Sequence, residues 1–148
     1  MNREKAYRQA VYDVLQNIAV DVNGLLTNVP VYDNKLEGDV DLYVLFEAQT
    51  AQNESAYPLQ IWRSVIEVSI YHTQQDSATF SIVDDITEII EDRILQSHNI
   101  NKFATQTGWQ IDNTYLTSVN ALKYESFKDG AGTVVQKILQ ISSQLIKQ

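Results

Sequence analysis

Clustered carboxylates are the residues of this sequence with the clearest chemical potential. Four of them fall in one short segment rich in Asp, Asn and Gly: Asp33, Glu37, Asp39 and Asp41. Carboxylate oxygens grouped in this way are ligands for a hard cation such as calcium. The segment lacks the bidentate Glu that follows the glycine turn of an EF-hand, so a solvated turn is the favoured interpretation. A metal-assisted enzyme that uses Asp33, Asp39 and Asp41 is the minor alternative.

A second and denser group of acids follows at helical spacing. It consists of Asp84, Asp85, Glu88, Glu91 and Asp92. Glu88 lies four residues from both Asp84 and Asp92, which places these three on one helix face. Like charges so placed cost stability. The favoured interpretation is an ordinary solvated helix face, and the functional alternative is a repulsive lining or a charge patch for a partner.

The remaining residues with chemical potential form no catalytic set. His72 and His98 have no acid at a spacing that defines a relay or a ligand set, and we interpret them as surface or strand-end residues. The sequence has no cysteine, which excludes disulfides, thiolate catalysis and sulfur-ligated metals. The glycines at 130 and 132 are too close together for a dinucleotide loop, and neither a Walker-type lysine motif nor G-x-S-x-G occurs. We therefore predict a protein that is not an enzyme and that uses no cofactor or metal.

Length and charge narrow the class of protein further. The 148 residues fit one domain, which we assign to residues 1–148. The net charge of −8 argues against a protein that binds nucleic acid electrostatically, although an acidic surface can surround DNA without holding it. No apolar run approaches the roughly 20 residues of a membrane span. The N-terminal segment lacks the apolar core of a signal peptide, so we expect the chain to be made and kept in the cytosol.

The elements that must position these acids follow from the apolar periodicity. Alternation with a period of two predicts strands over 41–50 and 60–72, antiparallel to each other and joined by a hairpin connection at 51–58. An extended piece over 28–33 and a loop over 34–41 precede them.

Two helices are expected from apolar residues at helical spacing. The first covers residues 4–22 and ends at Gly24. The second covers about residues 78–96, with Asp76 or Ser77 as its N-cap.

The C-terminal part is less regular. We expect a loop over 97–110, a strand over 115–127 and a glycine turn at 129–132. Residues 133–146 fit a helix and a strand almost equally, and their β-branched content favours a strand paired with 115–127. The predicted fold class is α+β, a mostly antiparallel sheet with two helices packed on it.

The order of these elements and their local sequences resemble a known family. The segments that carry the likeness are V-P-V-Y-D at 29–33, Y-V-L-F-E at 43–47, I-W-R-S-V-I-E-V-S-I-Y at 61–71 and the helix with I-V-D-D-I-T-E-I-I at 82–90. Together they resemble the tail completion (tail terminator) proteins of long-tailed bacteriophages, over about residues 4–146. That family caps the tail tube and joins it to the head.

The resemblance implies a function as well as a fold. It implies a small tail-terminator-like α+β domain without catalytic residues that assembles as a ring, typically a hexamer, around the DNA path. The implied partners are other copies of the chain, the tail tube protein and the neck or connector proteins, with no membrane, and DNA passes through without specific binding. The implied location is the tail or neck of a virion made in the cytoplasm of a bacterial host. A terminator, a stopper and an adaptor ring all remain possible positions.

These expectations assign roles to two sets of residues. The candidate acids that face the lumen or a partner are Asp84, Asp85, Glu88, Glu91 and Asp92. The candidate residues of loops between subunits are Asp33, Glu37, Asp39, Asp41, Glu54 and Tyr57. The alternative function is a soluble monomeric or dimeric cytosolic module that binds a small ligand or a peptide, which predicts a pocket with a few convergent polar groups.

Overall fold

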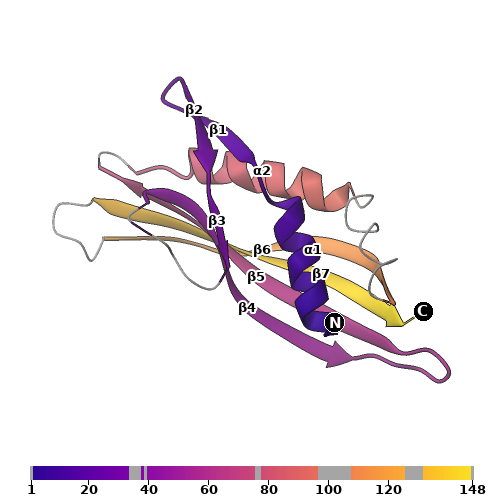
Figure 1. The fold of residues 1–148 in the computed structure, drawn as a ribbon. Helices are drawn as coiled ribbons and strands as arrows, with labels where there is room; N and C mark the ends of the chain where they lie inside the picture. Colours follow the sequence, from indigo (N-terminus) through magenta and orange to yellow (C-terminus); the bar gives the residue numbers. More distant parts are fainter. Residues whose placement is uncertain are drawn as a thin grey trace.

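A five-stranded sheet, two helices and a separate β-hairpin make up the described part of the chain (Figure 1). The computed structural model describes residues 2–33, 38, 40–75, 78–96, 108–125 and 132–147. Its elements are α1 (Arg3–Val14), β1 (Ile18–Val22), β2 (Leu25–Val29), β3 (Val31–Asp33), β4 (Leu42–Asn53), β5 (Ile61–Gln74), α2 (Ser81–Leu95), β6 (Trp109–Glu125) and β7 (Thr133–Lys147).

The sheet has the strand order β3-β4-β5-β7-β6. Every neighbouring pair is antiparallel except β3 and β4, which run parallel over three residues. Among the described strands, β1 and β2 pair with each other alone, and they stand above the sheet, close to α2 (Figure 1). The predicted fold class, a mostly antiparallel sheet with two helices packed on it, is confirmed.

Both helices lie on the same face of the sheet, which we call the covered face (Figure 1). On β7 the side chains of Ser143 and Lys137 point to this face, where Tyr7 of α1 donates to Ser143 Oγ at 2.8 Å and Lys137 pairs with Asp84 of α2 at 3.0 Å. No helix of the described residues lies on the opposite face, which we call the open face. The core is therefore one layer between the helices and the covered face; its fully buried members include Val11, Phe46, Ile66, Ile70, Ile86, Ile90, Leu139 and Ile141.

The first predicted helix is too long. α1 ends at Val14, and residues 18–29 form the β1–β2 hairpin instead. Ile18 and Val22 are four residues apart, so they fit a helix, but they also fit a strand in which Val20 is their neighbour on the same side. The deciding signal is Asn23-Gly24, where both residues have positive φ, as a tight two-residue hairpin turn requires. Gly24 thus belongs to this turn and does not end a helix.

The second predicted helix is confirmed with a later start. α2 begins at Ser81 with Phe80 in the N-cap position, so the expected cap by Asp76 or Ser77 is wrong. Those two residues lie outside the described part of the chain. No helix within the described ranges is both long enough and apolar enough to cross a membrane.

The strand predictions hold, with longer elements than expected. The strands predicted over 41–50 and 60–72 are β4 and β5. The connection between them covers residues 54–60, where 51–58 was predicted. The extended piece over 28–33 is confirmed as the end of β2 followed by β3. The loop at 34–41 falls largely outside the described residues.

The C-terminal half of the chain forms the two longest strands. β6 begins at Trp109, so the predicted strand over 115–127 starts earlier than expected and the loop ends before residue 109. Residues 133–146 are strand, as favoured, and β7 lies between β5 and β6. Residues 97–107 and the glycine turn, apart from Gly132, lie outside the described residues.

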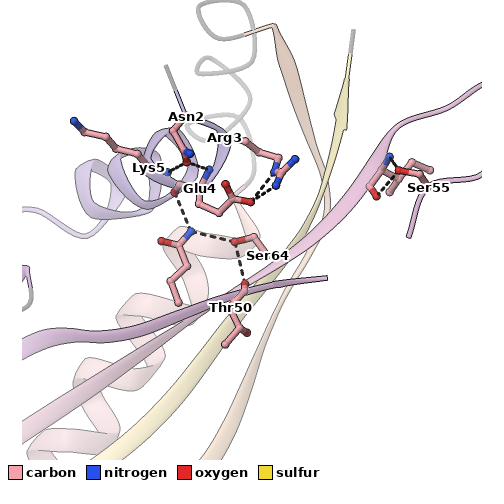
Figure 2. A network of polar contacts seen from close by, with 9 residues as sticks. Asn2, Arg3, Glu4, Lys5, Thr50, Ser55 and Ser64 are labelled. Carbon is pink, nitrogen blue, oxygen red and sulfur yellow. Dashed lines mark hydrogen bonds and ion pairs between the residues drawn. The ribbon is translucent and has the colours of Figure 1, made fainter. Parts of the chain in front are cut away.

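The start of α1 is fixed to the sheet by a polar network (Figure 2). Asn2 Oδ1 caps the helix by accepting from the backbone N–H of Glu4 and Lys5, at 2.9 and 3.2 Å. Gln49 of β4 donates to the carbonyl of Glu4 at 2.9 Å and to Ser64 Oγ at 3.1 Å. These bonds tie the first turn of α1 to the ends of β4 and β5, at the edge of the covered face.

Candidate functional site

The outer surface of α2 carries the densest cluster of charged side chains in the described part of the chain. Val83, Ile86, Ile90 and Ile94 are buried on its inner side, which leaves the five predicted acids exposed on the outer side. We call Asp84, Asp85, Glu88, Glu91 and Asp92 the acidic ridge. That these side chains face a lumen or a partner stays a prediction.

A groove runs between the acidic ridge and β1. Its volume is about 350 Å³, and it is lined by Ala19, Val20, Asp21, Asp85, Glu88, Ile89 and Asp92. Asp21 adds a fourth carboxylate to the three contributed by the ridge. The sequence did not reveal it, because residues 4–22 were interpreted as one helix; the alternation of β1, with Val20 buried and Asp21 exposed, was the available signal.

Not all five ridge acids have the same surroundings. Asp84 pairs with Lys137 of β7 at 3.0 Å and lies in the first turn of α2, where a negative charge suits the helix dipole. Glu88 lies within four residues of the other four acids, so it stands at the centre of the ridge. At the Asp84 end of the ridge, the negative charge is therefore balanced by Lys137. At its centre, Glu88 is surrounded by like charges.

Arg93 holds α2 in place beside α1. Its guanidinium donates to the carbonyl oxygens of Val14 at 3.3 Å, Asn17 at 3.0 Å and Gln16. Val14 is the last residue of α1, Gln16 and Asn17 follow it, and the last turn of α1 contains no basic residue of its own. Arg93 thus supplies hydrogen-bond donors to backbone carbonyls at and after the end of α1, and it connects α2 to that segment.

The four predicted loop residues that the structure describes do not come together at one site. Asp33 ends β3, and its carboxylate accepts from Arg8 Nε at 2.6 Å. Glu54 pairs with Arg63 at 3.0 Å near the far end of β4, and Tyr57 is fully exposed at the tip of that hairpin. Asp41 precedes the 12 residues of β4 and Glu54 follows them, so these two lie ~40 Å apart, and Asp33, opposite Phe46, lies between them. Glu37 and Asp39 lie outside the described residues.

The acidic loop shows no ligand set within the described residues. No group of three or more His, Cys, Asp or Glu side chains there could hold a metal ion. Asp33 is engaged by Arg8, and the backbone carbonyl of Asp41 accepts from the N–H of Thr73 at 2.7 Å.

His72 borders a polar hollow beside the start of α2. The hollow has a volume of about 530 Å³ and is lined by Val22, Asn23, His72, Thr73, Gln74, Gln75, Thr79, Ser81 and Ile82. His72 Nδ1 is buried and has no hydrogen-bond partner among the residues that the structure describes. Burial lowers the pKa of His72 below its usual value, and the nearby charge of Asp41 opposes this shift in part. The side chain is therefore neutral at neutral pH.

A network of tyrosines on the open face went unnoticed in the sequence. Tyr43 and Tyr71 stack with ring centroids 4.9 Å apart, and the Tyr71 hydroxyl donates to the carboxylate of Glu47. Gln136 donates to Tyr71 Oη at 3.1 Å and accepts from Tyr124 Oη at 3.2 Å. Burial, together with the hydrogen bond to Glu47, raises the pKa of Tyr71 well above its usual range. The network joins β4, β5, β7 and β6 on the open face.

The sequence pattern could not indicate this network, because its members belong to four strands. Glu47 is the residue that a β-bulge inserts between Phe46 and Ala48, and bulges turn a side chain out of the regular alternation. The spacing of residues along the sequence does not reveal where such a bulge occurs.

Comparisons with known proteins support the fold. No protein-family model matches this sequence, and no curated protein matches it. Among solved structures, a chain described as "Virion of native gene transfer agent (GTA) particle" is similar, with a TM-score of 0.55 and 11% sequence identity. The likeness covers 97% of this chain and 94% of that chain. At this identity it shows a shared fold over nearly the whole length.

Proposed function

We propose that this chain is a structural protein of a phage-like virion, where it forms a ring at the head–tail junction. The observation that carries the proposal is a fold shared over 97% of the chain with a chain of a gene transfer agent virion. The order of sequence segments that resembles tail terminators points the same way. In this role the ring, a hexamer, ends the tail tube or joins it to the capsid connector, and DNA passes through its lumen.

The surface of the molecule is compatible with sliding DNA. The chain has a net charge of −8, and the ridge and its groove concentrate carboxylates at one surface. Such a surface repels phosphates at short range, whereas a DNA-binding protein presents a basic face. The acidic ridge would then face the lumen or a neighbouring ring, and the chain would need no catalytic residue.

Contacts between subunits would use the sheet edges and the exposed loops. Tyr57 is fully exposed and Leu59 is 54% exposed at the tip of the β4–β5 hairpin, which projects beyond the helices (Figure 1). Exposed apolar side chains at a projecting tip are typical of surfaces that become buried in an assembly. The tail tube protein and the neck or connector proteins are the further partners of the ring.

Light scattering on the purified chain, followed by negative-stain imaging of the same sample, tests the proposal. We expect a discrete multiple of 16.8 kDa and particles with an open centre. A chain that stays monomeric at high concentration, and also in the presence of isolated tail tubes, would contradict it.

The part played by the ridge has its own test. Reversing the charge of Asp84, Glu88 and Asp92 together should impair DNA passage or the joining of rings while leaving the subunit folded. If particles assembled with this variant package and release DNA normally, the ridge neither lines the lumen nor contacts a partner.

A soluble module that binds a small ligand or peptide is the second candidate. The hollow beside His72 favours it, because several polar side chains and one unpaired ring nitrogen border the same space. This function predicts a monomer or dimer that is thermally stabilised by a saturating ligand. A ring in solution would argue against it.

A further inference from the structure

The outer edge of β6 is the most exposed part of the sheet. β6 is 17 residues long and pairs with β7 on one side, and no other strand of the described residues pairs with its outer side. Its side chains Tyr115, Val119 and Leu122 are 48%, 50% and 37% exposed. Residues 114–122 contain no charge and no proline.

Such an edge is unusual in a protein that stays monomeric. Natural edge strands are kept short, or carry charges and prolines, because an open edge pairs readily with another strand. The two register shifts of β6, at 112–115 and 118–120, interrupt the edge but leave residues 115–118 in regular pairing with β7. We infer that this edge is covered by another strand when the protein is assembled.

The opposite side of the sheet offers a second open edge. β3 covers β4 only at residues 44–46, and the pairing stops where Arg8 donates to both the Asp33 carboxylate and the carbonyl of Phe46. Beyond that point, residues 47–53 of β4 pair with β5 alone among the described strands. Ala48 and residues 50–53 are exposed.

The polarity of the strands makes these two edges complementary. β4, β5, β7 and β6 alternate in direction along the sheet, so β6 runs opposite to β4. If a second copy is placed beside the first with its helices on the same side, its β4 lies next to β6 and antiparallel to it. The alternation then continues from one subunit into the next without a break.

We propose that β6 of one subunit pairs antiparallel with residues 47–53 of β4 in a second copy of the chain. This inference rests on the proposed ring, because the contact joins two different surfaces and so propagates around an axis until it closes. It also places Tyr115 and Val119 beside the adjoining strand, where main-chain hydrogen bonds would give affinity and side chains would fix the register.

A pairing of β6 with β6 across a two-fold axis would also be antiparallel, but it would give closed dimers. The two arrangements can be separated because the chain has no cysteine of its own. Thr117 and Thr50 point to the same face of the sheet. Thr117 pairs with Gln140 of β7, whereas Thr50 pairs with Val65 of β5, which in turn pairs with Ser142 of β7. Gln140 and Ser142 are two residues apart on one strand, so their side chains share a face.

The experiment is a disulfide cross-link between copies of the full chain. A variant with Thr117→Cys and Thr50→Cys is oxidised with diamide, and Ala48→Cys and Gln52→Cys replace Thr50→Cys to sample neighbouring registers. We expect a ladder of covalent dimers, trimers and larger species for at least one double variant, because a disulfide forms only when the two Cα atoms lie within about 7 Å of each other. Each single variant should stay at the monomer.

The outcomes separate this inference from the proposed function. Rings without a ladder in any register would overturn the β6–β4 contact and leave the ring proposal standing. A ladder that does not close into rings would support the contact and count against the ring. A strong covalent dimer of Thr117→Cys alone would replace the contact by a two-fold β6–β6 pairing.

A charged residue in the edge supplies an independent test. Val119→Lys places an ammonium group in the contact at a side chain that is half exposed, so the subunit should fold with its thermal stability unchanged. The solution mass should fall to that of the monomer. The matched control is Leu95→Lys at the end of α2, where Leu95 is 59% exposed and is not part of the edge strand; it should keep the mass of the unchanged chain. Equal masses for both variants would overturn the inference.

Discussion

The covered and open faces of the sheet are built on different principles. The centre of the covered face is aliphatic and aromatic, and its side chains there are fully buried against α1 and α2. The open face is half buried, and its order comes from hydrogen bonds and ring stacking among Tyr43, Glu47, Tyr71, Tyr124 and Gln136. The folding energy therefore comes mainly from one face, which leaves the other face and the edges available for contacts between molecules.

The largest expected effect contrasts two neighbours on β4. Phe46 is completely buried on the covered face, while Leu45 is half buried on the open face. We expect Phe46→Ala to lower the free energy of unfolding by about 3–5 kcal/mol, because it removes a large ring from a packed core. Leu45→Ala should cost about 1 kcal/mol, in line with an average substitution. Urea denaturation of both variants measures the contrast, and equal losses would show that the open face is also buried in solution.

The next largest effect on stability concerns Arg93, which attaches α2 to the segment at the end of α1. Arg93→Met keeps most of the side-chain volume but removes the donors to the carbonyls of Val14, Gln16 and Asn17. We expect a loss of about 1.5–3 kcal/mol, the range for hydrogen bonds to a charged group. Arg93→Lys should recover part of it. If Arg93→Met is as stable as the unchanged chain in thermal denaturation, α2 is held by its apolar residues alone.

A smaller effect should appear as a pH dependence of stability. His72 lies on the covered face between Leu42 and Val135, and burial lowers its pKa in the folded state. As the pH falls, the unfolded chain therefore takes up the proton on His72 before the folded chain does. The contribution of neutral His72 to the free energy of unfolding is fully present above about pH 6.5, the ordinary pKa of His, and is lost as the pH falls below that value. Urea midpoints between pH 7.5 and pH 5.5 should decline for the unchanged chain and less steeply for His72→Gln. Identical slopes would contradict the assignment.

Much of the fold was readable from the sequence because strands and helices leave short-range patterns. The alternation of β4 and β5 and the helical spacing of α2 each span enough residues to decide the element type. The error at residues 15–22 arose where Ile18 and Val22 satisfy both periods. The Asn23-Gly24 turn, which pairs β1 with β2, is the local signal that decides for a strand. The packing of β1 beside α2 is a tertiary contact, and no local pattern contains it.

The candidate site was only partly readable for the same reason. The five ridge acids lie on one helix and could be grouped by spacing alone, but Asp21 joins them through tertiary packing of β1 against α2. The open-face network depends on a bulge at Glu47 and on four strands. The two sheet edges likewise became visible only with the strand order.

The smallest expected effect tests whether the ridge is kept acidic at a cost to the fold. Glu88 has like charges three or four residues away on both sides, so Glu88→Gln should raise the free energy of unfolding by about 0.2–0.5 kcal/mol for each repulsive neighbour relieved. The matched change Asp84→Asn should lower it by up to about 1 kcal/mol, since Asp84 has Lys137 as a partner. Both changes should shrink in 1 M salt, where charges are screened beyond about 3 Å.

If the acidic ridge destabilises α2 in the isolated subunit, its carboxylates are explained by a role in the assembly. If Glu88→Gln stabilises the isolated chain but impairs assembly or DNA passage, the carboxylate serves the assembly at the expense of the fold. If Glu88→Gln instead lowers stability at low salt, the carboxylate is held by a favourable interaction within the subunit. In that case the acidic ridge is an ordinary solvated helix face, and the functional contrast in this molecule lies between the covered face and the sheet edges alone.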